Sequence, residues 1–500
     1  MIAFCIGILN INRDLYETTE GRYAECAREM LAESDFLNPM LNYHAHWTKP
    51  PLTYWAIAMG IQVAHGSEWG VRLYLLFSFV GTTVCVYWLA RLMWGTSVAP
   101  ICALVYCTSL YPAVSSDIIS TDMLLSFWEA VALLFFWMGF KEKKAWAYIA
   151  MWFAFGAAFL TKGPPGLLFL SGVIPTYLIG KRNGLRGPAL FSPVGILCFI
   201  GVGLGWYIYE AVHTPGLLHY WLGSEVYERV LTDHFKRNSH WTSIFTVYGT
   251  ILLFGSMPWA LVLFANWKNI SQKIRENFKC LLQPDKVQYF FLTISIFAPL
   301  TVFCISESRL HLYLLPMFVP ISLIVGRIVH EYCASKALKR CLAATLIFAI
   351  LLAFTGKSVV ANKETKKSLK HVASEINVLL EVLPGEENLC YFGNQIPYSL
   401  QYYVGRSIDQ ILISPQEEEP TYTTDDIVEI FENDLQNGLS PVVLVNAGQL
   451  SILEDALYAS PLRTYIINCA NHENGDMEMA NCLSQLKNDQ DNAIFLVVIQ

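Results

Sequence analysis

The sequence predicts a mainly α-helical protein that crosses a membrane many times and ends in a small soluble α/β domain. Hydrophobic residues make up 54% of the 500 and charged residues only 15%, which is too apolar for an ordinary soluble protein. Residues 357–500 differ, because they hold 21 acidic against 8 basic side chains. We therefore expect a membrane domain over 1–356 and a soluble domain over 357–500.

The membrane domain is expected to contain about eleven transmembrane helices. Its opening run, Met1–Ile11, is shorter than the roughly 20 residues that cross a bilayer, so it is either a truncated start or the end of a first span. It also lacks the basic start and the cleavage site of a signal peptide. The apolar runs that follow are 71–90, 98–115, 123–140, 145–160, 164–180, 190–212, 244–267, 289–305, 310–329 and 341–356.

Lysine and arginine gather in alternate loops between these runs, and the positive-inside tendency makes those loops cytoplasmic. The N-terminus is then cytoplasmic as well. The outer face receives 12–69, 116–122, 161–163, 213–243, 306–309 and everything after 357.

The first outer loop, 12–69, contains two amphipathic pieces. Apolar residues recur at helical spacing over 23–31, and Pro50 and Pro51 begin a Leu52–Val63 helix at positions that proline tolerates. We expect these pieces to be interfacial helices along the membrane surface.

Five basic residues of the predicted outer face each lie close to a predicted membrane boundary, and the positive-inside tendency does not explain them. A lipid phosphate or diphosphate would account for the set, since arginine and lysine are the usual phosphate partners. The alternative is that they snorkel or form salt bridges at span ends. The five residues are Arg22, Lys49, Lys162, Arg229 and Arg309.

The C-terminal part combines short β-branched runs, such as 442–446 and 493–499, with helix-like stretches, which is typical of a small α/β domain. It shows no glycine-rich phosphate loop and no nucleophile elbow. Its acidity argues against a nucleic-acid partner. The 13 cysteines of the chain show no CxxC pair or Cys/His ligand spacing, which favours buried thiols over a zinc site or a disulfide framework.

The first outer loop carries the residue types that transfer of a lipid-phosphate-linked sugar requires. A carboxylate deprotonates the acceptor, cations hold the leaving phosphate, and aromatic rings stack on the sugar. These types are supplied by Glu17, Glu20, Arg22, Tyr23, Trp47 and Lys49. Their spacing is weakly specific, and a solvated pair of Glu20 and Arg22 is the alternative.

A series of motifs in chain order adds a more specific signal. The motifs are Glu20-Gly21-Arg22-Tyr23-Ala24-Glu25, Lys49-Pro50-Pro51-Leu52, Thr121-Asp122-Met123, Leu160-Thr161-Lys162-Gly163-Pro164, Gly205-Trp206-Tyr207, Pro258-Trp259 and Ser308-Arg309-Leu310-His311-Leu312-Tyr313. Over about residues 14–330 the chain resembles the aminoarabinose-transferase and protein O-mannosyltransferase group of integral-membrane glycosyltransferases, which are of the GT-C type.

This resemblance implies transfer of a sugar from an undecaprenyl-phosphate-type donor to an envelope acceptor, which is lipid A, a glycan or a protein. It places the reaction on the periplasmic face of a bacterial inner membrane. Glu20 would sit at the acidic motif, with Asp122 in the polar lining of the site. The residues implied around the donor phosphate are Arg22, Tyr23, His46, Lys49, Lys162, Arg309 and Tyr313. For Asp122 and Lys162, a helix cap or an ion pair is the alternative.

Two positions depart from the pattern of that group. Thr19 stands where the group usually has an aspartate, and Thr48 stands where it usually has a glutamate. Threonine cannot act as a base, so Glu20 or Glu17 is the nearest candidate, and we prefer Glu20. His46 either bonds the phosphate or assists a metal, or does neither. No nucleotide is required, because the lipid link already activates the donor. No cofactor is assigned, and a divalent metal stays an open alternative.

Two other classes of function stay in view. A catalytically altered member of the group would act as a membrane assembly or scaffold protein. A transporter of lipid-linked sugars would place ionisable residues inside its spans, as Glu129 and Glu210 are here, but the sequence shows no internal repeat.

Overall fold

The structure is a computed structural model in which the chain forms two compact units. The first unit holds Met1–Arg13, Asp35–Pro39 and His46–Lys363, and the second holds Asp14–Ser34, Met40–Ala45 and Glu364–Gln500. The second unit thus includes parts of the segment that the sequence assigned to the first outer loop. The described residues are 1–9, 11–17, 19–184, 187–228, 238–265, 267, 286–332, 336–363, 368–382, 386–393, 396–411, 424–446, 449–450, 452–453, 457, 464–468 and 494–499.

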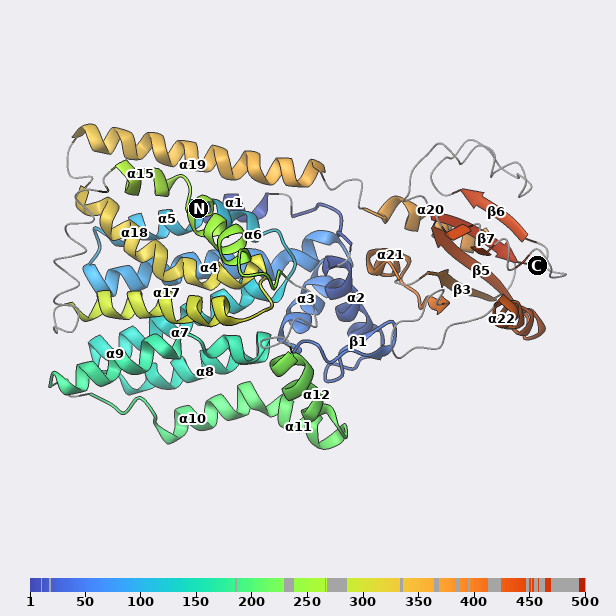
Figure 1. Cartoon of the computed structure of the whole chain (residues 1–500), viewed down its shortest axis with the longest axis horizontal. Helices are drawn as coiled ribbons and strands as arrows, with labels where there is room; N and C mark the ends of the chain where they lie inside the picture. Colours follow the sequence, from blue (N-terminus) through green and yellow to red (C-terminus); the bar gives the residue numbers. More distant parts are fainter. Residues whose placement is uncertain are drawn as a thin grey trace. The chain divides into compact units, whose positions relative to one another are not determined.

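The regular secondary structure described in the first unit is all helical, and its long helices run roughly side by side (Figure 1). The α-helices are α1 (Ile2–Ile8), α3 (Leu52–Val63), α4 (Glu68–Trp94), α5 (Ala99–Thr108), α6 (Leu110–Ser115), α7 (Thr121–Glu142), α8 (Ala145–Lys162), α9 (Leu170–Arg182), α10 (Pro193–Phe199), α11 (Gly205–His213), α12 (Leu217–Tyr220), α14 (Thr250–Phe254), α15 (Trp259–Ala265), α17 (Val287–Ile305), α18 (Phe318–Tyr332) and α19 (Lys336–Lys363). The 3₁₀-helices are η1 (Pro164–Leu167) and η5 (His311–Met317). The π-helices are η2 (Ile200–Leu204), η3 (Trp221–Glu228) and η4 (Ile244–Gly249).

Five helical segments of the described part are long and apolar enough to cross a membrane. They are Glu68–Trp94, Thr121–Glu142, Pro193–His213, Val287–Ile305 and His311–Glu331, and each overlaps an apolar run expected from the sequence. The prediction of a mainly helical protein is therefore confirmed, and these five helices are candidate membrane spans by their length and composition. The α3 helix also begins and ends where proline and the apolar pattern placed it.

The turn between α7 and α8 brings two charged residues to the same end of the helix pair. The side chain of Ser120 caps α7 by accepting a hydrogen bond from the N–H of Asp122, in the first turn. Lys143 then adopts a left-handed φ of 59° and the chain reverses into α8, which ends at Lys162 and is followed by Gly163 with a φ of 78°. Asp122 is thus at a helix N-terminus and Lys162 at a helix C-terminus, where their charges complement the helix dipoles.

A buried ion pair fastens the N-terminal helix to the last helix of the first unit. Lys357 of α19 is 1% exposed, and its Nζ lies 2.7 Å from Asp117 Oδ1 and 2.6 Å from the carbonyl oxygen of Ile6. Arg13 donates to the carbonyl of Asp117 at 2.9 Å. These contacts join α1, the loop before α7 and α19.

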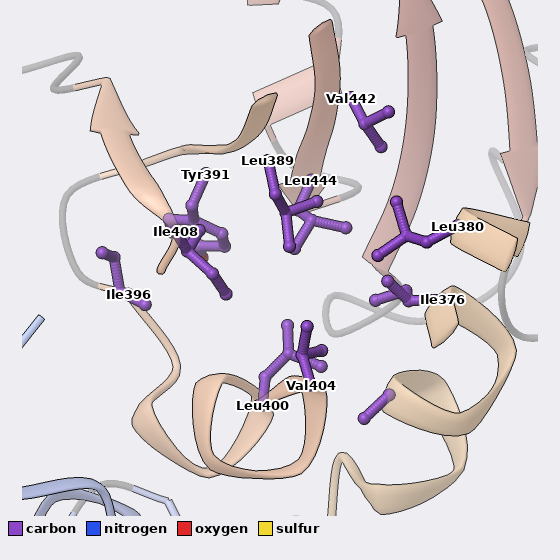
Figure 2. Close-up of a cluster of buried hydrophobic side chains, with 11 residues drawn as sticks. Ile376, Leu380, Leu389, Tyr391, Ile396, Leu400, Val404, Ile408, Val442 and Leu444 are labelled. Carbon is purple, nitrogen blue, oxygen red and sulfur yellow. The ribbon is translucent and has the colours of Figure 1, made fainter. Parts of the chain in front are cut away.

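The second unit contains a five-stranded sheet in the order β4-β3-β5-β7-β6. Strand β3 pairs in parallel with β4 and β5, whereas β7 pairs antiparallel with β5 and β6. Figure 2 shows the core on one side of the sheet, where Leu389, Val442 and Leu444 meet Ile376 and Leu400 from helices. The elements are β3 (Glu386–Phe392), β4 (Asp409–Ile411), β5 (Leu439–Asn446), β6 (Thr464–Asn468), β7 (Ile494–Ile499), α20 (Lys370–Val382), α21 (Tyr398–Val404) and α22 (Thr424–Gln436).

Helix α2 (Thr19–Ala32) and the short hairpin of β1 (Met40–Leu41) and β2 (His44–Ala45) complete this unit. A Cβ added at Gly21 would lie 2.3 Å from the backbone nitrogen of Ser399, so only glycine allows α2 to approach α21 this closely. Gln401 Nε2 donates to Asn42 Oδ1 at 2.7 Å. Helix α21 is therefore tied both to α2 and to the hairpin.

Candidate active site

A cavity of about 420 Å³ lies within the first unit. Apolar side chains make most of its wall, including Leu125, Phe159, Leu168 and Phe303. The charged residues that line it are Lys49, Asp122, Glu129, Lys162 and Glu225. The cavity therefore combines the apolar wall that a lipid chain needs with a few charges that would hold a polar group.

Lys49 reaches the cavity from the turn before α3. Its Nζ donates to the carbonyl oxygen of Thr48 at 2.6 Å and lies 3.4 Å from Glu225 Oε2, and its side chain is 18% exposed. His46 Nε2 and Thr48 Oγ1 share a hydrogen bond of 2.7 Å. His46 thus serves the turn that presents Lys49, and Thr48 lines the cavity beside it.

Asp122 and Lys162 form the second ion pair of the cavity wall. Their side chains are 7% and 10% exposed, so water screens the pair little. The Lys162 ammonium also lies 4.6 Å from the centre of the Tyr313 ring, in a cation–π contact. Sequence reasoning expected Lys162 and Tyr313 near a donor phosphate and Asp122 in the polar lining of the site, and the structure brings the three together.

Glu129 lies seven residues after Asp122 in α7, about 10 Å further along the helix axis at the usual rise per residue. It is 2% exposed and lines the same cavity. Its Oε2 has no hydrogen-bond partner among the described residues. Glu210, the other acid expected inside a span, is 1% exposed in α11 and is not among the residues of the cavity wall.

A group of aromatic residues borders the Lys49 end of the cavity. Trp221 packs against Tyr207 and Trp206 with ring centres 4.9 and 5.3 Å away, and Trp47 lies 6.2 Å from Trp206. The indole N–H of Trp221 donates to the carbonyl of Trp47 at 3.1 Å. Trp47, Tyr207 and Trp221 line the cavity and offer flat faces of the kind on which sugar rings stack.

Arg309 has a different environment from Lys49 and Lys162. It is 5% exposed, and its guanidinium donates to the backbone carbonyls of Asn238, Ser239, His240 and Cys304. It is not among the residues that line the cavity. The structure therefore shows Arg309 holding the chain near Asn238, and its expected phosphate contact stays a prediction. Arg229, expected in the same set, lies outside the described residues.

The remaining candidates, Glu17, Glu20, Arg22 and Tyr23, belong to the second unit. Glu17 Oε1 accepts from the N–H of Ser399 at 2.6 Å, and burial raises the pKa of this carboxyl although that hydrogen bond opposes the rise. Glu20 is 3% exposed and accepts from the N–H of Tyr16 at 3.2 Å. Tyr23 is buried and Arg22 is partly exposed on α2. Their sharing of one pocket with Lys49 stays a prediction.

Glu225 is the cavity residue that sequence reasoning missed. The only signal for it is an acid in the outer segment 213–243, four residues after Trp221. Among the described residues, no three His, Cys, Asp or Glu side chains are grouped as metal ligands would be. A metal requirement therefore stays open to experiment.

Comparisons with known proteins agree with this architecture. Residues 48–236 match the family model described as dolichyl-phosphate-mannose-protein mannosyltransferase. The chain is 28% identical over 385 residues to undecaprenyl phosphate-alpha-4-amino-4-deoxy-L-arabinose arabinosyl transferase 2 of Sodalis glossinidius, which covers 74% of this chain and 66% of that protein. A corresponding transferase of Yersinia pestis is 28% identical over 346 residues, 67% of this chain and 59% of that protein. The chain thus spans less than two thirds of the length of these relatives.

The crystal structure of ArnT from Cupriavidus metallidurans bound to undecaprenyl phosphate has the same fold. Its TM-score is 0.76 at 18% identity, and the superposition covers 99% of this chain and 96% of that one. The predicted resemblance to the aminoarabinose-transferase and protein O-mannosyltransferase group is confirmed.

Proposed function

We propose that this chain is a membrane glycosyltransferase that takes a sugar from an undecaprenyl-phosphate-type donor and transfers it to an acceptor of the cell envelope. The observation that carries the proposal is the cavity of the first unit, in which two lysines face an apolar wall. The curated relatives are named as transferases that use an undecaprenyl-phosphate-linked sugar, which supports the same donor class here.

The donor phosphate is held by Lys49 and Lys162. Each ammonium already pairs with a carboxylate at the cavity, so each is held in position before the ligand arrives. A phosphate that enters from the apolar side exchanges with these carboxylates and keeps the lysines neutralised. As the bond to the sugar breaks, negative charge grows on the phosphate, and cations in a poorly hydrated site lower the barrier for that step.

The sugar stacks on the aromatic faces of Trp47, Tyr207 and Trp221, and the polyprenyl chain follows the apolar wall past Leu125 and Phe303. A carboxylate takes the proton of the acceptor. Asp122 faces the cavity, and Glu20 and Glu17 remain the candidates that the sequence favoured.

The orientation follows from the distribution of lysine and arginine. We infer a cytoplasmic N-terminus, about eleven spans, and a site and C-terminal domain on the periplasmic face of a bacterial inner membrane. The acceptor is lipid A, a glycan or a protein.

The test is a transfer assay with the full chain in lipid nanodiscs, a radiolabelled polyprenyl-phosphate sugar, and envelope membranes as the source of acceptor. We expect label in an envelope acceptor, and loss of transfer in a Lys49→Ala, Lys162→Ala double variant. Lys144→Ala is the matched control, because that lysine is 47% exposed and pairs with Glu142 away from the cavity.

Transfer of label by the wild type and by Lys144→Ala, with none by the double variant, would support the proposal. A wild type that binds the donor but transfers no label would overturn it and would favour the assembly-protein alternative.

A further inference from the structure

Glu225 reaches the cavity from a segment that is remote in sequence from the other charged residues. Its Oε2 lies 3.4 Å from Lys49 Nζ, 176 positions away, and its side chain is 13% exposed. The cavity therefore has a lysine–carboxylate pair at Lys49 as well as the pair of Lys162 with Asp122.

Trp221 holds the segment that carries Glu225 against the turn of Lys49. Its indole N–H donates to the carbonyl of Trp47, and the residue is 8% exposed in a cluster with Trp206, Tyr207 and Leu160. Glu225 follows about one helical turn after Trp221 in η3. The hydrogen bond from Trp221 to Trp47 holds η3 against the turn before α3. The ion pair of Glu225 with Lys49 is a second contact between the same two segments.

The charges that line the cavity show why an anionic ligand would displace the Glu225 carboxylate from Lys49. Two lysines face three carboxyl groups, those of Asp122, Glu129 and Glu225. A lipid phosphate competes with Glu225 for the ammonium of Lys49. That ammonium stays in place during the exchange, because it also donates to the carbonyl of Thr48 at 2.6 Å. Phosphate binding therefore leaves the Glu225 carboxylate beside the bond that is to break.

We propose that Glu225 is the catalytic general base of the transfer, an inference that rests on the proposed function. Glu225 takes the proton of an acceptor hydroxyl while the acceptor oxygen forms a bond to the anomeric carbon. The bond from that carbon to the phosphate oxygen breaks, and its electron pair leaves with the polyprenyl phosphate, which Lys49 and Lys162 neutralise. Thr48, which adjoins Lys49 in the chain, cannot take this proton, and Glu225 supplies the missing carboxylate from η3.

The first test compares Glu225→Gln with the wild type in nanodiscs. We expect kcat to fall by about 100-fold or more, the size of effect that a lost general base produces. Undecaprenyl phosphate should bind about two- to fivefold more tightly, because the Glu225 carboxylate no longer competes with the phosphate for Lys49. The increase is small because a partly exposed ion pair contributes little free energy. A residue with a merely structural role would weaken both binding and transfer. Glu142→Gln, which removes an exposed ion pair outside the cavity, is the matched control and should change neither.

The second test moves the carboxylate to the other side of Lys49. The Thr48→Glu, Glu225→Gln double variant should recover at least about tenfold in kcat over Glu225→Gln, since a carboxylate again adjoins the same ammonium. The Thr48→Gln, Glu225→Gln variant has nearly the same shape without the charge and should recover nothing.

Two results would overturn the inference while the proposed function stands. One is a Glu225→Gln variant with the kcat of the wild type, and it would be the more decisive if Glu20→Gln abolished transfer in the same assay. The other is equal recovery by Thr48→Glu and Thr48→Gln. A wild type that transfers no sugar would instead defeat the proposed function, and the inference with it.

Discussion

Two carboxylates of the second unit and two of the first have opposite kinds of partner. In the second unit, Glu17 accepts from the backbone N–H of Ser399, and Glu29 accepts from those of Asn42 and Tyr43 at 2.8 and 2.9 Å. In the first unit, Asp122 and Glu225 face lysines on the wall of a cavity. A carboxylate bonded to backbone amides is part of the fold. One that is paired with a lysine at a cavity can give up its partner to an anionic ligand.

The largest effect on activity is expected from a substitution in a cavity ion pair, where a phosphate would replace the carboxylate. Lys162→Ala removes a cation from the cavity and leaves Asp122 without its ion-pair partner, so we expect transfer to fall by about 100-fold or more. The measurement is kcat/KM for the labelled donor in nanodiscs. Lys162→Ala with kcat/KM within about twofold of the wild type would break the comparison, because the pair would then be a structural one.

The next largest effect is expected on stability, at the contact of α2 with α21 in the second unit. Gly21→Ala places a Cβ against the backbone of Ser399 and should destabilise the contact of α2 with α21 by about 1–3 kcal/mol, the usual cost of overpacking. Hydrogen exchange of the α2 and α21 amides in the full chain measures this loss. Gly201→Ala is the control, since a Cβ there meets no atom within 4 Å. Unchanged protection in Gly21→Ala would contradict the close approach of these helices.

A pH dependence should follow from the burial of Glu17. Because burial raises the pKa of this carboxyl above 4.5, the folded state holds its proton more tightly than the unfolded state. The free energy of opening α21 should therefore decrease as the pH rises from 4.5 through the raised pKa. Exchange of the 398–404 amides, corrected for the intrinsic rate at each pH, gives that free energy.

Glu17→Gln keeps an oxygen for the N–H of Ser399 and has no titrating group at residue 17. In this variant the free energy of opening α21 should not change over the same pH range. If the wild type is equally flat, the structural assignment of Glu17 is wrong.

The smallest effect is expected at Tyr313. Tyr313→Phe keeps the ring beneath the Lys162 ammonium and loses only the hydroxyl, so transfer should fall by no more than about fivefold, whereas Tyr313→Leu should fall further because the cation–π contact is lost. The ratio of the two kcat/KM values is the readout. Equal losses would show that the hydroxyl, and not the ring, acts on the donor.

The sequence was sufficient for the features that depend on local pattern. Apolar runs located the long helices, the proline pair located the start of α3, and motif resemblance selected Lys49, Asp122, Lys162 and Tyr313, which the structure brings to one cavity.

Features that depend on tertiary contact were beyond sequence reasoning. Glu225 lies 176 positions from Lys49, and no periodicity links the two. Arg309 has the charge for a phosphate, yet both terminal nitrogens of its guanidinium donate to backbone carbonyls that only the folded chain places around it. The first outer loop reads as one polar segment, but packing against α21 draws α2 into the second unit.

The most direct test of the central claim is the equilibrium binding of undecaprenyl phosphate to the full chain in nanodiscs, before any chemistry. We predict that the Lys49→Ala, Lys162→Ala variant binds at least about tenfold more weakly than the wild type, while Lys144→Ala binds equally well. Binding of wild-type strength by the double variant would contradict the claim that this cavity holds the lipid phosphate.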